Sequence, residues 1–137
     1  MATKVLRHEK SFPVVAGATI LAGQLCGLNS SGQAVLADAD AATPIEAVGF
    51  AVTDIASGAT GALARFGVLE DASWTWTPPG KVYLSGTAGG YTETKVSTAT
   101  NIVQAVGRSQ SATKIIVDID WAPAVLQAAG NSTLAVY

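Results

Sequence analysis

The sequence has few charged residues. Asp, Glu, Lys and Arg make up 13% of the 137 residues, against about a quarter in a typical soluble domain, while apolar residues make up 49%. Such a chain either keeps its surface soluble with hydroxyl and amide groups or hides part of that surface in an assembly. We favour the assembly, because a monomer of this composition would expose adhesive apolar patches.

Cysteine and histidine are almost absent, and each occurs once, as Cys26 and His8. A single cysteine excludes an intrachain disulfide, and its apolar neighbours predict that Cys26 is a small buried residue. Zinc sites need several Cys or His ligands, and a Ser-His catalytic arrangement is hard to build around one His near the N-terminus. We therefore expect no metal, no cofactor and no enzymatic activity.

Long apolar runs are also lacking. The best candidate, 13–23, is interrupted by Gly17 and Thr19 and is too short to span a bilayer. The first ten residues lack the apolar core of a secretory signal. A net charge of −2 gives no strong field for nucleic acid or an anionic membrane. The sequence thus predicts synthesis in the cytoplasm, with neither nucleic acid nor membrane as a partner.

Two pairs of carboxylates lie two residues apart, Asp38 with Asp40 and Asp118 with Asp120. Such pairs can bind calcium or act as acid and base, but the spacing of a calcium-binding loop is absent. We interpret them as solvated strand edges or turn caps. The glycine-rich segment 57–61 is interpreted as a turn, because no Gly-Lys-Ser/Thr follows it to hold a phosphate.

The sequence does contain many short apolar segments separated by Gly, Ser, Thr and Asn, the pattern of strands joined by tight turns. The clearest segment is 114–121, where polar and apolar residues alternate. Its apolar side chains lie on one face of a sheet, and they are Ile115, Val117, Ile119 and Trp121. The polar positions are Lys114, Asp118 and Asp120, and only Ile116 breaks the alternation. Further strands are predicted at 12–15, 25–29, 33–37, 46–53, 62–70, 73–77, 81–84 and 102–107. The fold class is all-β, a small single-domain β-sandwich or barrel of roughly eight to ten short strands.

We expect three regions along the chain: an extended N-terminal arm over 1–11, a β domain over 12–121, and a C-terminal tail over 122–137 with room for one short helix. The arm is basic, because only Glu9 opposes its cations. It is either a solvated, frayed terminus or an arm that docks on an acidic neighbouring subunit.

Aromatic residues gather in the middle of the chain. The period of two in 73–77 places Trp74 and Trp76 on one face of a strand, and Tyr83 and Tyr91 follow. Three roles stay open for them: core packing, a subunit interface, or a stacking surface for sugars or bases.

Four stretches of the sequence resemble the head decoration (cement) proteins of tailed bacteriophages: AGATILAGQLCGLNSSGQAV, AVGFAVTDIASGATGALARFGVLE, PPGKVYLSGTAGGYT and IVQAVGRSQSATKIIVDI. The similarity runs from about Ala16 to Asp120. Related sequence patterns occur in short β modules of phage fibre proteins. The resemblance supplies no catalytic residue.

This resemblance implies a structural protein on the outer surface of an expanded phage head, synthesised in the host cytoplasm, commonly trimeric, that bridges and stabilises major capsid protein subunits. The alternative is a fibre or spike module that binds a host surface glycan through Trp74, Trp76 or Tyr91. We expect the basic arm to contact neighbouring subunits through its charges, and the apolar tail to contact them by burying apolar side chains. The candidate capsid or subunit interface residues are Lys4, Arg7, His8, Lys10, Trp74, Trp76, Trp121, Leu134, Val136 and Tyr137.

Overall fold

The structure is a computed structural model that describes residues 3–40, 44–94, 102–119 and 124–125. This part of the chain contains strands and turns and no helix, which confirms the all-β prediction. The strands are β1 (Lys4–Val15), β2 (Leu25–Leu28), β3 (Ala34–Leu36), β4 (Gly49–Ala51), β5 (Thr60–Glu70), β6 (Lys81–Leu84), β7 (Tyr91–Thr92), β8 (Ile102–Val103), β9 (Ala105–Ser109), β10 (Lys114–Asp118) and β11 (Ala124–Val125).

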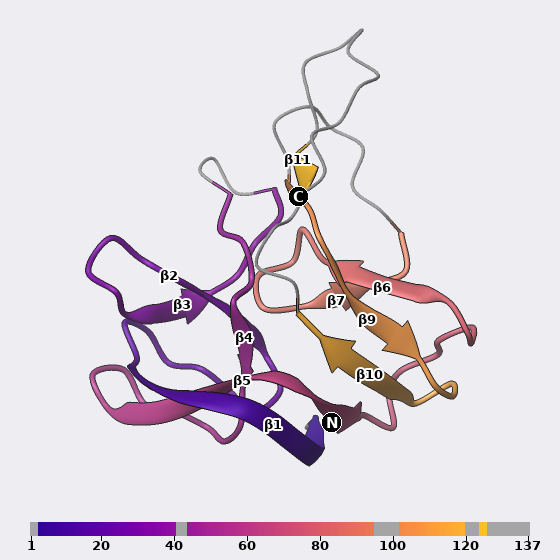
Figure 1. Ribbon diagram of the computed structural model, residues 1–137, viewed down its shortest axis with the longest axis horizontal. Helices are drawn as coiled ribbons and strands as arrows, with labels where there is room; N and C mark the ends of the chain where they lie inside the picture. The colour runs from indigo at the N-terminus through magenta and orange to yellow at the C-terminus, as the bar shows by residue number, and fades with distance from the viewer. Residues whose placement is uncertain (1–2, 41–43, 95–101, 120–123, 126–137) are drawn as a thin grey trace, which may run out of the picture.

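Nine strands form one curled antiparallel sheet, built around the long strand β5 (Figure 1). One edge of β5 pairs with β1 along almost its whole length. Its other edge pairs first with β4 and then with β10, so the sheet divides there into two halves. One half continues through β2 and β3, and the other through β9, β6 and β7; β8 and β11 form a separate pair.

The buried apolar side chains form two groups, and the larger one draws on strands from both halves of the sheet. Phe50, Leu69, Ile115 and Val117 belong to the larger group, and Ile20, Ala51, Ile55 and Leu63 to the smaller one. Strand β5 supplies Leu63 to one group and Leu69 to the other. The burial of each Leu, Ile, Val or Phe side chain in these groups stabilises the fold by roughly 1.5–3 kcal/mol, and β5 joins the two groups.

Glycine allows β1 to approach β5 closely where the two groups meet. Gly67 is the Cα partner of His8 on β1. A methyl group at Gly67 would collide with the carbonyl oxygen of Arg7 and would lie 2.6 Å from the ring of Phe50. Only a residue without a side chain fits between the edge strand and the core at this point.

A buried glutamine bridges two segments far apart in sequence. The side chain of Gln104, 1% exposed, accepts a hydrogen bond from the backbone N–H of Ala47 and donates one to its carbonyl, both 2.8 Å long. It lies between β8 and β9, where the sequence predicted one continuous strand over 102–107. At this break in the ladder, the side chain of Gln104 supplies hydrogen bonds to the backbone of Ala47. Buried backbone groups need such partners, so we attribute the interruption of the strand to this bridge.

Most predicted strands are present, with changed boundaries. Ile115 and Val117 in β10, and Ile119 directly after it, are buried as the alternation predicted. The turn at 29–32 joins β2 and β3 as expected, with Gly32 at φ 76°. Strand β1 begins at Lys4 and not at 12, so the basic residues of the predicted arm lie in a strand that pairs with β5. Within the span of the predicted short helix, Ala124 and Val125 form strand β11.

The prediction of a strand over 73–77 is wrong, because this segment has no ladder partner. Asp71 diverts it: its carboxylate accepts hydrogen bonds from the N–H and hydroxyl of Ser73 at 2.9 and 2.6 Å, and from the hydroxyl of Thr3 at 2.9 Å. Such local side-chain bonds compete with sheet formation. Both tryptophans nevertheless pack against the larger core group.

Replacing Asp71 with Asn is expected to destabilise the fold by about 1–3 kcal/mol, because a buried acceptor of three hydrogen bonds loses its charge. Burial raises the pKa of Asp71, but the hydrogen bonds from Ser73 and Thr3 outweigh it, and the net pKa is below the usual 3.8. Because the pKa of Asp71 is lower in the folded state than in the unfolded state, its ionised carboxylate stabilises the fold at every pH above the unfolded-state pKa. This stabilisation is lost as the pH falls through the folded-state pKa.

Urea unfolding of the wild type and Asp71→Asn at pH 7 and pH 3 measures this effect. The difference between the two proteins should shrink at pH 3. Thr3→Val, which removes one of the three bonds, should have a smaller effect than Asp71→Asn. An equal gap at both pH values would contradict the assignment.

Candidate interaction surface

One side of the sheet carries most of the described cations. Direct cross-strand partners in an antiparallel sheet point to the same face, so the strand register defines rows of side chains. The longest row crosses five strands and consists of Arg7, Val68, Ile116, Arg108 and Lys81. The flanking rows contain Lys4, Glu70 and Lys114 on one side and Glu9, Phe66 and Asp118 on the other. We call the surface formed by these three rows the outer face.

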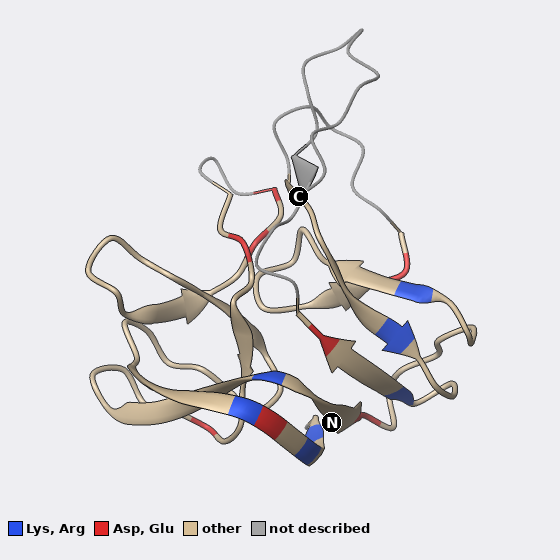
Figure 2. Cartoon of the chain, viewed as in Figure 1, with Lys and Arg blue, Asp and Glu red and all other residues tan. Residues whose placement is uncertain are grey.

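The outer face is positive, although the chain as a whole has a net charge of −2. Its five cations, Lys4, Arg7, Lys81, Arg108 and Lys114, exceed its three carboxylates. Figure 2 shows blue segments on β1, β5, β6, β9 and β10, and red segments both on β1 and β10 and on the loops beside β3 and β4. The cations are therefore concentrated on the strands of the outer face, whereas the carboxylates are spread over the molecule.

Two of the three carboxylates on the outer face already have cationic partners. Glu9 accepts a 2.7 Å hydrogen bond from Nε of Arg7, and Glu70 lies 4.0 Å from Nζ of Lys114. Both pairs are exposed to solvent, so each stabilises the fold by at most about 1 kcal/mol. These pairs leave the positive charge of Lys81 and Arg108 unbalanced by any described ion pair.

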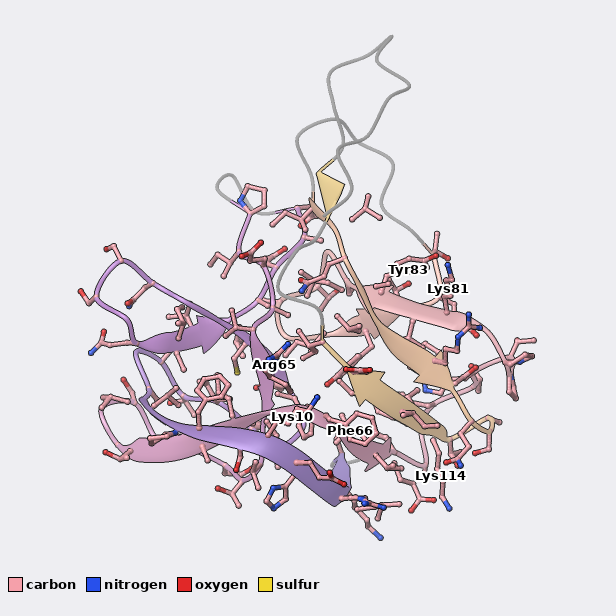
Figure 3. The ribbon with its side chains drawn as sticks, viewed as in Figure 1. Lys10, Arg65, Phe66, Lys81, Tyr83 and Lys114 are labelled. Atoms are coloured by element: carbon pink, nitrogen blue, oxygen red, sulfur yellow. The ribbon has the colours of Figure 1, made fainter. Side chains whose placement is uncertain are left out.

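A shallow hollow of about 360 Å³ lies on the outer face over β5, β10, β9 and β6. Phe66 and Ile116 provide apolar surface, and the charged groups Lys81, Arg108 and Asp118 line the same hollow. Figure 3 labels Phe66 and Lys81. Sequence analysis missed this group. Its one signal was Ile116, which broke the alternation because it faces outward into the hollow.

The cations predicted in the N-terminal arm are exposed on β1. Lys4, Arg7, His8 and Lys10 all lie in this strand and are accessible to solvent. The side of β1 away from β5 pairs with no other strand among the residues described. Three features interrupt this outer edge: a bulge between Val5 and Arg7, Lys10 at φ 57°, and Pro13, which has no N–H.

The predicted aromatic residues form a packed cluster. The rings of Trp74 and Trp76 lie edge to face with centroids 5.3 Å apart, and Trp74 meets Tyr91 in the same way at 5.8 Å. Burial, with a smaller contribution from Cys26, raises the pKa of Tyr91, whose hydroxyl donates a 2.6 Å hydrogen bond to Gly23. Edge contacts and burial favour core packing over a flat surface for a sugar.

The other predicted interface residues, Trp121, Leu134, Val136 and Tyr137, lie outside the described residues. Cys26 is buried as predicted, and burial raises the pKa of its thiol to about 12, so it stays protonated and unreactive at neutral pH. Within the described ranges no three His, Cys, Asp or Glu residues gather as metal ligands would, and those ranges hold no helix of the length and hydropathy needed to cross a membrane.

The comparison with protein families decides what kind of protein this is. The model of a family described as phage cement protein matches residues 6–119, a range that includes the whole sheet apart from the first two residues of β1. The chain belongs to the phage cement protein family. No curated protein matches the chain.

A phage cement protein is a structural component of the virion capsid, and the family is not one of enzymes. The resemblance stated from the sequence is thereby confirmed. The outer face and the exposed cations of β1 are the concentrations of positive charge on the described part of this cement protein.

Proposed function

We propose that this protein binds the outside of an expanded phage head as a trimer and bridges neighbouring major capsid subunits, which stabilises the shell. The observation that carries the proposal is the family match across 6–119. A ligand that binds one state of an assembly and not another shifts the equilibrium toward that state. A protein that prefers the expanded shell would thus oppose its disruption by heat or internal pressure.

In this proposal the exposed cations of β1, Lys4, Arg7, His8 and Lys10, contact the capsid. They lie in a strand held to β5 by ten register pairs, so the charges are presented on a fixed scaffold. Fixed groups lose less conformational entropy on binding than groups on a mobile arm. Trp121 and the apolar residues near the C-terminus, Leu134, Val136 and Tyr137, are proposed to add buried contact area.

A trimer makes weak individual contacts sufficient. Once one subunit is bound, the other two meet their sites at high effective concentration, so the whole assembly dissociates far more slowly than one subunit. Exposed charge contacts, each worth at most about 1 kcal/mol, can then hold the protein on a head.

The test is the composition of purified virus particles and the mass of the protein in solution. We expect the protein on the outside of DNA-filled heads, accessible to antibody, at a fixed ratio to the major capsid protein, and a trimeric mass in solution. Heads without it should lose their DNA at a lower temperature. Absence from particles would reject the proposal, and a purely monomeric mass would reject its trimeric step.

A further inference from the structure

Two cations face each other directly on the outer face. Lys81 on β6 and Arg108 on β9 are Cα partners in adjacent antiparallel strands, and both are exposed. Like charges in this position repel and destabilise the strand pair. Arg108 donates a 3.0 Å hydrogen bond to the carbonyl of Pro79, which holds the guanidinium in place. In the part of the chain that the structure describes, neither cation has a carboxylate within 4.0 Å.

The chemistry around this pair specifies what would bind there. The hollow beside it is lined by the apolar atoms of Phe66, Ile116 and Ala105 and, besides the two cations, by Asp118. Two cations against one carboxylate leave a net positive charge, so a group that fits carries a carboxylate next to an apolar side chain that covers the floor of the hollow.

The segment between β3 and β4 presents that combination. Glu46 is exposed and directly follows Ile45, which pairs with Asp38 through two backbone hydrogen bonds of 2.9 Å. Ile45 and Glu46 line a second hollow together with Leu28 and Val48, and Leu28 is 44% exposed. Asp38 and Asp40 add negative charge at this end. We call it the acidic end, defined by Asp38, Asp40, Ile45 and Glu46.

We propose that the hollow bearing Lys81 and Arg108 binds the acidic end of a second copy of this chain. Both the charges and the apolar surfaces are complementary. The hollow lies over β5, β10, β9 and β6, and the acidic end lies between β3 and β4 (Figure 1). Because the two surfaces are distinct, each copy uses both, and the contact is head to tail. Repeated head-to-tail contacts close into a ring when the rotation allows it. The inference rests on the trimer of the proposed function and assigns the contact that forms it.

The test measures the mass and dissociation constant of the protein alone, by sedimentation at several concentrations. The hollow variant carries Lys81→Glu and Arg108→Glu, and the acidic-end variant carries Asp40→Lys and Glu46→Lys. Each should raise the trimer dissociation constant at least 100-fold. A swap variant with all four substitutions should restore the constant to within tenfold, because the attraction is re-formed with reversed signs.

A control with the same change in net charge as the hollow variant is Arg7→Glu with Lys10→Glu on β1, which should stay trimeric. The single variant Lys81→Glu gives a second readout: it places an anion opposite Arg108, so the thermal unfolding midpoint of the monomer should rise while the trimer weakens. Circular dichroism confirms that each variant is folded.

The outcomes separate this inference from the proposed function. A trimer with an unchanged dissociation constant in the hollow variant would overturn the inference and leave the trimer in place. A swap variant that stays dissociated would overturn the acidic end as the partner surface. A wild type that is monomeric at every concentration would overturn both the inference and the trimeric step.

Discussion

Replacing Arg7 and Lys10 with Glu is expected to weaken retention on phage heads on the order of 100-fold. Both side chains are exposed on β1 and neither is part of the core. An exposed charge contact is worth roughly 0.5 kcal/mol, and six of them across a trimer amount to roughly 3 kcal/mol, which corresponds to a factor of about 100 in affinity. Reversal of sign adds repulsion to the loss of attraction.

Binding of labelled protein to purified heads at several salt concentrations measures this effect. The wild type should lose affinity as salt rises, because exposed charges are screened, while the variant should respond less. Point substitutions are preferable to deletion of the first ten residues, which would strip part of β1 from β5. A variant that binds as tightly as the wild type at low salt would show that β1 does not face the capsid.

Replacing Gly67 with Ala should destabilise the fold more than any exposed substitution. The added methyl group collides with the backbone of Arg7 and crowds Phe50, and neither is the flexible end of a side chain. Overpacking of this kind lowers the free energy of unfolding by about 3 kcal/mol, a large part of the total stability of a small domain. The melting temperature should fall by on the order of 10 °C.

Gly32 supplies the control for this substitution. It lies in the β2–β3 turn at φ 76° with open space around it, and Asn tolerates that conformation. Gly32→Asn should therefore leave the melting temperature almost unchanged. Equal effects at Gly32 and Gly67 would contradict the close packing of β1 on β5.

The sequence could predict what depends on local pattern. Alternation identified the buried side of β10, and turn residues identified the β2–β3 hairpin, because both follow from neighbouring residues. The cationic hollow could not be predicted, since Phe66, Lys81, Arg108 and Ile116 come together only through the register of four strands. The charges of 4–10 led to the prediction of an arm separate from the β domain. In the structure this segment is part of β1 and pairs with β5.

The tryptophan segment shows how one side chain can override a pattern. The alternation of 73–77 suits a strand, but hydrogen bonds to Asp71 bend the chain, and the 2.8 Å bond from the N–H of Trp76 to Ala112 does not extend into a ladder. The family was recognisable from sequence because the segments that resemble it extend over most of the chain. The surfaces that contact partners were recognisable only in part, because the predicted cations of β1 are exposed while the tryptophans are packed in a cluster.

The interrupted outer edge of β1 affects whether copies of the protein can associate by backbone pairing. A long, flat edge strand would recruit further copies into fibrils by backbone pairing. The bulge after Val5, the left-handed Lys10 and the missing N–H of Pro13 prevent a straight ladder from forming there. The edge of β1 therefore resists fibril formation by copies of this chain, although it is exposed along most of its length.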